Sequence, residues 1–429
     1  MDLAGILNCR RRLEWTKEWL KKNQTQFMTK ENIQKEIQFR SNESYPLNPF
    51  FDITEKQFHF LVTKLEPVIS GYEPHRKKKP FSAEERIAIT LKYLATGEVH
   101  SCRNYCFRAS KPVILKMIAD ICLNIYDLLK DQFVCTPKTD EQWQTIANEL
   151  LQNKKIPNCL GNLTMQQIEF YTNPRNEAPV GEVHFSKNPP LIFTAIVDNN
   201  NNFMYVDVER TTAKAKDEIF EHSKIVQLIE SHQFPVLTEG RATQDAISTS
   251  SYFVGHDALP LKPYLMNSGY YMPGRSDPSY ASCKPNHPEF PYRIAMDAIN
   301  EHASDALQML GNIFPILGQP LRIDEANARK ITLGCVALYN FLRKTDKSFY
   351  EHSERICDIE EEEVADGDDD CILLANDEER RELEANRPYI AVTNCFRGLR
   401  KQKGETLAGQ TKRAWLMEHL VLVRQQKKA

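Results

Sequence analysis

Apolar residues in the first part of the chain recur at the three- and four-residue spacing of amphipathic helices. One helical stretch is expected within residues 7–40, where Trp15 and Trp19 stand among basic side chains. Another is expected over residues 55–66, beginning after Thr54, whose hydroxyl suits an N-cap. The front of the chain is therefore predicted to be all-α.

Residues 82–129 follow the order helix, short helix, turn, helix. Ser82 and Glu85 form a capping-box pattern that begins the first helix, and Gly97 ends it. Ser110 caps the last helix, which is expected to run to about Leu129. This order predicts a helix-turn-helix, with a plain three-helix packing module as the alternative. The side chains offered to DNA would be Lys111 and Lys116, with Arg103 and Arg108 on the approach.

Short apolar runs of strand type replace the helical spacing in the middle of the chain. Two of them, within residues 185–198 and over residues 203–208, flank an Asn-rich turn and predict a hairpin. A third run, Tyr252–Gly255, ends in the polar pair His256 and Asp257, as a buried strand does when it delivers side chains to a site. These patterns predict an α/β domain after the helical region.

The charge is unevenly distributed, although the formal net charge is only −3. Residues 1–130 carry 22 Lys and Arg against 15 Asp and Glu, whereas residues 351–386 carry 3 against 16. Residues 387–429 are basic again, with 10 against 2. Two basic regions around an acidic one favour a protein that handles a polyanion, and solvated surface with a disordered acidic linker is the alternative.

A basic linker lies between the predicted helices of the first part of the chain. It is predicted to act as a nuclear-localisation element or as an arm that contacts phosphates. A solvated loop is the alternative; the basic residues are Arg76, Lys77, Lys78 and Lys79.

The 11 cysteines are scattered and include no C-x-x-C pair, which favours neither a disulfide framework nor a zinc site. No apolar run is long enough to predict a membrane-spanning helix.

Several of these segments resemble the PIF/Harbinger-type DDE transposases. Residues 82–97 and 106–110 match the family's helical motifs, and residues 252–264 match its Val-Gly-Asp-Asp-Ala-Phe-Pro-Leu-(Lys/Arg)-Pro-Tyr segment. Residues 157–161 and 334–342 match two further family motifs, and the likeness spans roughly residues 10–345. The resemblance implies an RNase H-like domain of the DDE type, preceded by a helix-turn-helix.

The resemblance also implies three catalytic carboxylates, and this chain departs from the family at all three positions. They hold Thr164, His256 and Ser304. Strand cleavage on this fold uses paired Mg²⁺ ions, which are hard cations that prefer carboxylate and water oxygens. Two hydroxyls and an imidazole should not hold such a pair, so we expect no catalytic cofactor and an inactive site.

A displaced active site is the alternative, and it would need Mg²⁺ or Mn²⁺. Asp257 and Asp305 each lie one residue past a lost position. One residue along a strand reverses the side chain, and one along a helix turns it by about 100°, so neither carboxylate should aim at the original point. We expect Asp198 and Asp207 to be turn and hairpin carboxylates at the surface.

These patterns divide the chain into five regions. They are an N-terminal helical region (1–73), a basic linker with the helix-turn-helix (74–135), a degenerate RNase H-like DDE-type domain (136–345), an acidic disordered linker (346–386) and a basic tail (387–429). The tail is expected to form an amphipathic helix around Trp415, Leu416 and Leu420 that docks on its own domain or on a partner.

The favoured function is that of a domesticated Harbinger-type transposase that binds DNA or chromatin and has lost cleavage. The alternatives are an active metal-dependent DNA endonuclease and a protein-interaction scaffold without DNA affinity. The expected location is the nucleus, with the cytoplasm as a second compartment, and no membrane partner is expected. By analogy with the family, a nuclear protein with a Myb-like or MADF domain is an expected partner.

Overall fold

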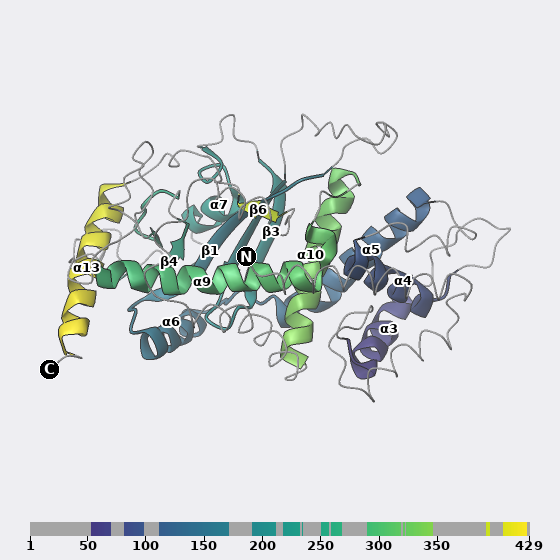
Figure 1. The fold of residues 1–429 in the computed structure, drawn as a ribbon, viewed down its shortest axis with the longest axis horizontal. Helices are drawn as coiled ribbons and strands as arrows, with labels where there is room; N and C mark the ends of the chain where they lie inside the picture. The colour runs from purple at the N-terminus through teal and green to yellow at the C-terminus, as the bar shows by residue number, and fades with distance from the viewer. Residues whose placement is uncertain are drawn as a thin grey trace, which may run out of the picture. The chain divides into compact units, whose positions relative to one another are not determined.

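The computed structural model of the chain describes only part of its residues, and the helices and strands below carry the labels of Figure 1. The described residues are 53–69, 81–97, 111–170, 191–211, 218–231, 234, 250–256, 259–267, 290–318, 321, 323–345, 392–394 and 406–426. The helix expected within 7–40, the basic linker, the short helix expected between 97 and 110 and the expected acidic linker lie outside them. The chain divides into two compact units, which are taken in turn.

The first unit is built from helices. Its described elements include α3 (Glu55–Ile69), α4 (Ala83–Thr96), α5 (Lys111–Phe133), the 3-10 helix η5 (Pro315–Gly318) and α10 (Glu325–Thr345). The capping box at the start of α4 is confirmed, because the Glu85 amide donates to Ser82 Oγ (3.1 Å) and the Ser82 amide donates to Glu85 Oε2 (2.9 Å). Gly97 ends α4 in the left-handed region (φ 64°), as the sequence predicts. Both α3 and α5 run a few residues beyond their predicted ends.

Helices α5 and α10 pack closely although they lie far apart in the chain. A Cβ at Gly334 would lie 2.7 Å from Cys122 Cβ, so only glycine allows this approach. Lys330 pairs with Asp120 (2.6 Å), and the Asn340 amide donates to the carbonyl oxygen of Phe133 (2.8 Å). Contacts of three kinds therefore fix α10 along α5.

The second unit is organised around a mixed sheet. Its strands are β1 (Cys159–Ile168), β2 (Leu191–Val197), β3 (Phe203–Arg210), β4 (Tyr252–Gly255), β5 (Leu265–Met266) and β6 (Val392–Asn394). The order is β3-β2-β1-β4-β5, with β1, β2 and β3 antiparallel and with β4 and β5 parallel to β1. This arrangement is consistent with an RNase H-like topology, and the predicted hairpin and the predicted strand at 252–255 are both confirmed.

A bulge in β1 decides which side chains reach each face of the sheet. The register of β1 against β4 shifts between Cys159 and Asn162, and Gly161 adopts a positive φ of 124° there. An added residue lets Leu160 and Leu163 pack into the same apolar cluster, despite their odd spacing. Asn162 is thereby left on the opposite face.

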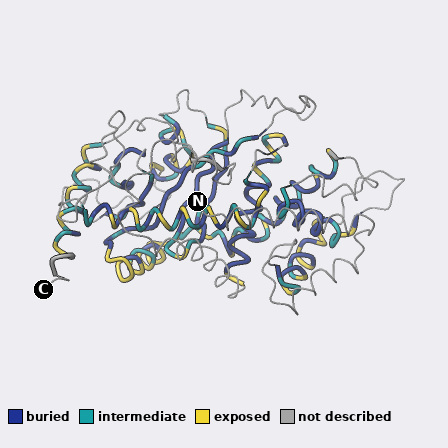
Figure 2. The backbone as a smooth tube through the Cα atoms, viewed as in Figure 1, coloured by how far each residue is buried: buried dark blue, intermediate teal, exposed yellow. Residues whose placement is uncertain are grey.

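Helices cover both faces of the sheet (Figure 1), and strands β2 and β4 are buried along their whole length (Figure 2). On one face α7 (Lys224–Glu230) packs with Trp143 of α6 (Asp140–Lys154), whose ring lies 5.9 Å from that of Phe253. Helix α9 (Phe290–Ile313) runs across the other face, with α13 (Leu407–Gln426) near its N-terminal end (Figure 1). No helix within the described ranges is long and apolar enough to cross a membrane.

The contact at Gly334 gives a stability prediction. We expect Gly334→Val to lower the free energy of unfolding by about 1–3 kcal/mol, because the new side chain must push into the Cys122 backbone. Chemical denaturation of the purified protein measures this change. Ala326→Val on the exposed side of the same helix is the control, and an equal effect of the two substitutions would refute the close-packing explanation.

Candidate functional site

The candidate site begins where β1 and β4 lie side by side in the sheet. Leu163 of β1 pairs with Gly255 of β4 in parallel register, and each strand continues with a polar residue, Thr164 and His256. These two positions are therefore neighbours across adjacent strands. The sequence linked these positions only by resemblance, and the register of the two strands, which ends at Leu163 and Gly255, places both positions at the point where β4 ends.

Helix α9 approaches the same face of the sheet. The Asn162 amide donates to Asn300 Oδ1 of α9 (2.7 Å), and Asn162 and Thr164 lie two residues apart on one strand, so they share a face. Ser304 follows Asn300 by one helical turn, and its hydroxyl donates to the Asn300 carbonyl oxygen (3.2 Å). The face thus gathers β1, the end of β4 and α9, although the Ser304 side chain is exposed.

The polar groups whose contacts the structure describes on this face are hydroxyls and amides. Thr164 is 7% exposed, and its Oγ1 accepts a hydrogen bond from the Gln166 amide (3.1 Å). Asn162 is 3% exposed and already paired with Asn300. Within the described part of the chain, no three His, Cys, Asp or Glu residues come together in a way that could hold a metal ion.

This arrangement does not support a displaced active site built on Asp257 and Asp305. Asp257 lies outside the described residues. Asp305 is half-buried on α9 and already has an interaction partner of its own. Asp198 serves the turn between β2 and β3, as predicted, because its Oδ1 accepts from the amides of Asn200 and Asn202 (2.8 Å each).

The expectation for Asp207 as a surface carboxylate is wrong. Asp207 is only 8% exposed, and it lies opposite Thr194 of β2 in the sheet. Lys224, the first residue of α7, places its Nζ 3.2 Å from the carboxylate and 3.5 Å from that of Glu209. Burial lowers the pKa of Lys224, but the two carboxylates outweigh it and the pKa is raised. Helix α7 therefore brings a cation to this nearly buried carboxylate.

The predicted DNA-binding residues lie mostly outside the described part of the chain. Those outside are Arg76, Lys77, Lys78, Lys79, Arg103 and Arg108. Lys111 begins α5, but its side chain is not described, whereas Lys116 is exposed on α5. Neighbouring Met117 and Ile118 are buried, so the first turns of α5 present Lys116 away from their apolar face.

Sequence reasoning missed the pairing of Asn162 with Asn300 and the half-buried His302. His302 Nδ1 lies 2.8 Å from Asn201 Oδ1 in the β2–β3 turn. Burial lowers the pKa of His302, and Lys154 lowers it further. A single Asn or His residue gives no local signal in the sequence that it will make such a contact. Gly161 was a hint of the bulge beside Asn162, because an isolated glycine in a strand suits a bulge.

Comparison with known protein families, with curated proteins and with solved structures finds no match.

The pairing of the two Asn side chains gives a second prediction. We expect Asn300→Ala to lower the free energy of unfolding by about 1–3 kcal/mol, because it leaves the buried Asn162 amide without its acceptor. Thermal or denaturant unfolding measures the change. Asn153→Ala on the exposed side of α6 serves as the control and should be near neutral. If Asn300→Ala is equally neutral, α9 is not held to β1 by this contact.

Proposed function

We propose that this protein is a domesticated Harbinger-type transposase that binds DNA in the nucleus and has lost strand cleavage. The observation that carries the proposal is the pairing of β1 with β4, which makes Thr164 and His256 neighbours in a sheet of order β3-β2-β1-β4-β5. In the resembling family these two positions hold carboxylates. Here the same part of the sheet offers a hydroxyl and an imidazole.

The loss of cleavage follows from the chemistry of Mg²⁺. Paired metal ions next to phosphates need several negative oxygens to offset their charge, and a hydroxyl contributes none. The hydroxyl oxygen of Thr164 accepts a hydrogen bond from the side-chain amide of Gln166, so part of its hydrogen-bonding capacity is used within the strand. A site of this composition supports binding or scaffolding and does not support metal-assisted hydrolysis.

DNA binding is supported by charge and by the helix that would carry it. Residues 1–130 hold 22 Lys and Arg against 15 Asp and Glu, and a basic surface supplies the sequence-independent part of DNA affinity. Lys116 is exposed on the first turns of α5, the helix that would enter the major groove. A Myb-like or MADF-domain protein that brings the chain to DNA belongs to the same proposal, on family analogy alone.

The test is the salt dependence of binding to a labelled DNA duplex, measured by fluorescence anisotropy. We expect the logarithm of the binding constant to fall linearly with the logarithm of salt concentration. Lys116→Ala should weaken binding and reduce the slope by about 0.9, the value for one lost phosphate contact. Lys130→Ala, at the other end of α5, is the control, because that amine pairs with Asp127 at 2.6 Å.

Three outcomes separate the candidate functions. Salt-dependent binding that leaves the duplex intact in the presence of Mg²⁺ supports the proposal. A folded protein with no affinity for DNA points instead to a protein-interaction scaffold. Metal-dependent nicking that disappears in Asp257→Ala or Asp305→Ala would restore the endonuclease.

A further inference from the structure

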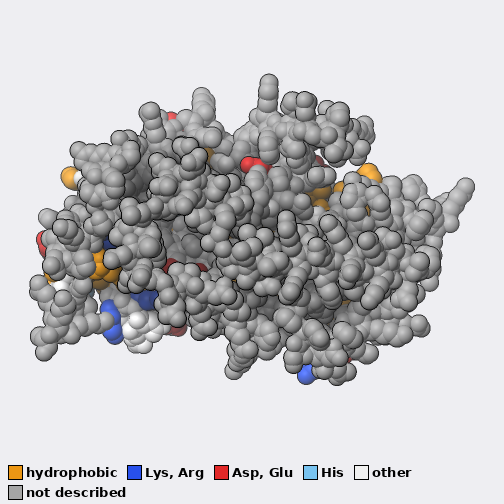
Figure 3. All heavy atoms as spheres, viewed as in Figure 1, with side chains coloured by type: hydrophobic (Ala, Val, Ile, Leu, Met, Phe, Trp, Pro, Cys, Tyr) orange, Lys and Arg blue, Asp and Glu red, His pale blue; other side chains and the backbone are white. Residues whose placement is uncertain are grey.

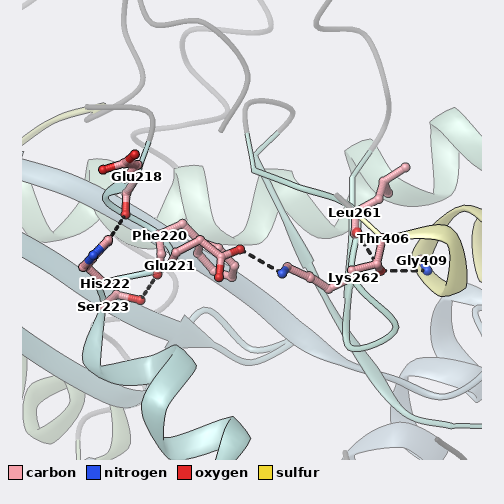
Figure 4. A network of polar contacts seen from close by, with 9 residues as sticks. All are labelled: Glu218, Phe220, Glu221, His222, Ser223, Leu261, Lys262, Thr406 and Gly409. Carbon is pink, nitrogen blue, oxygen red and sulfur yellow. Dashed lines mark hydrogen bonds and ion pairs between the residues drawn. The ribbon is translucent and has the colours of Figure 1, made fainter. Parts of the chain in front are cut away.

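Helix α13 is held against the second unit at its first turn by close backbone contact. Thr406 precedes the helix, and its amide and hydroxyl both donate to the Leu261 carbonyl oxygen (2.9 and 3.3 Å). The Gly409 amide donates to Thr406 Oγ1 (3.2 Å), as Figure 4 shows. A Cβ at Gly409 would lie 2.6 Å from the backbone of Leu261, so this turn fits only without a side chain.

Two leucines continue the same face of α13 into an apolar cluster. Leu416 and Leu420 are buried there with Tyr252, Tyr292 and Met296. Trp415 and Met417 are partly buried against the same cluster, whereas Leu407 is 79% exposed. Orange hydrophobic side chains reach the surface beside α13 in Figure 3. The most deeply buried stripe of the docked face includes Gly409, Leu416 and Leu420.

Lys412 lies in the middle of this stripe and is fully buried. Its Nζ donates to the Ser250 carbonyl oxygen and lies 2.7 Å from Ser250 Oγ. The amine also sits 4.9 Å from the centre of the Tyr252 ring. Burying an ammonium group is unfavourable unless a counter-ion accompanies it, and these partners are all neutral.

The other titratable groups around Lys412 do not supply a negative charge. Burial raises the pKa of the Cys159 thiol in β1 to about 12, and it raises that of the Tyr252 phenol as well. The nearby ring of Tyr292 on α9 lies 5.5 Å from the guanidinium of Arg413 on α13, which is a second cation. Among the described residues that pack here, no carboxylate faces the Lys412 amine.

We propose that α13 is a releasable latch on the second unit, and that proton uptake by the Lys412 amine undocks the helix and uncovers the apolar surface beneath it. The geometry points to this because the described partners of the buried amine are all neutral, and because the amine lies in the middle of the face by which α13 docks. The inference concerns the C-terminal tail and does not depend on DNA binding.

The direction of the pH dependence follows from the docked and undocked states. Burial lowers the pKa of docked Lys412 from 10.5 to about 7, and the nearby Cys159 opposes this only in part. Between these two values the undocked helix binds a proton that the docked helix does not. Docking therefore strengthens as pH rises through this range, by about tenfold per pH unit at most, and changes little below it.

Hydrogen exchange of the full-length protein, followed by mass spectrometry, tests the latch. We expect the protection of residues 407–426, corrected for intrinsic exchange, to rise by roughly tenfold between pH 7.0 and 8.5. Peptides from β1 and β2 should show no such change. Protection of α13 that does not depend on pH in the wild-type protein would overturn the proposal without recourse to any variant.

Variants then assign the effect to Lys412. Lys412→Met keeps a long, uncharged side chain, so α13 should stay protected at both pH values. Lys412→Arg carries a permanent charge, so protection should be low at both. Lys138→Met removes an exposed lysine of the same unit and should respond as the wild type does. A wild-type pH response that persists in Lys412→Met would show that another group controls the helix.

Discussion

The parallel pairing of β1 with β4 is the constraint on which the candidate site depends. Gly255 makes it possible, because a Cβ at this position would lie 2.7 Å from Leu259 Cδ1 and 3.3 Å from the Leu163 carbonyl oxygen. The register that results ends at Leu163 and Gly255, one residue before Thr164 and His256, and the Asn162–Asn300 hydrogen bond brings α9 to this part of the sheet. A sheet with this order can gather polar groups there whatever their charge. Their chemistry then decides between hydrolysis and binding.

Each compact unit balances buried polar groups in its own way. In the first unit, Lys330 neutralises Asp120 beside a glycine contact that brings two helices together. In the second unit, Lys224 pairs with the buried Asp207, whereas the described partners of the buried Lys412 amine include no carboxylate. An ammonium group next to a carboxylate keeps a counter-ion, whereas burial of an ammonium group among neutral partners is unfavourable. The proposed pH response of the tail helix rests on this contrast.

The elements that local patterns encode could be predicted from the sequence. The Ser82–Glu85 capping box, the Asn-rich turn after β2 and the apolar run of β4 are signals contained in a few consecutive residues. The amphipathic tail helix was predicted around Trp415 for the same reason, and it docks on its own unit, one of the two expectations. The RNase H-like domain, by contrast, was expected from family resemblance, and the strand order of the sheet is consistent with that topology.

The features that depend on distant residues could not be read from the sequence. Asp207 looks like a surface carboxylate until α7 folds back and places Lys224 against it. Nothing near Lys412 in the chain indicates burial, because Ser250 and Tyr252 lie far upstream. The same holds for the approach of α10 to α5, although Gly334 in the middle of a helix was a hint of close packing. Long-range pairing of charges and amides is set by the fold as a whole.

The most direct test of the central claim restores the carboxylates that the resembling family carries. The variant Thr164→Asp, His256→Asp, Ser304→Glu is compared with the wild-type protein by calorimetric titration with Mn²⁺, after circular dichroism shows that both are folded. If β1, β4 and α9 converge on a former metal site, the variant should bind Mn²⁺ and the wild type should not. A folded variant that binds no metal would contradict the geometry, and a wild type that binds Mn²⁺ equally well would contradict the loss of cleavage chemistry.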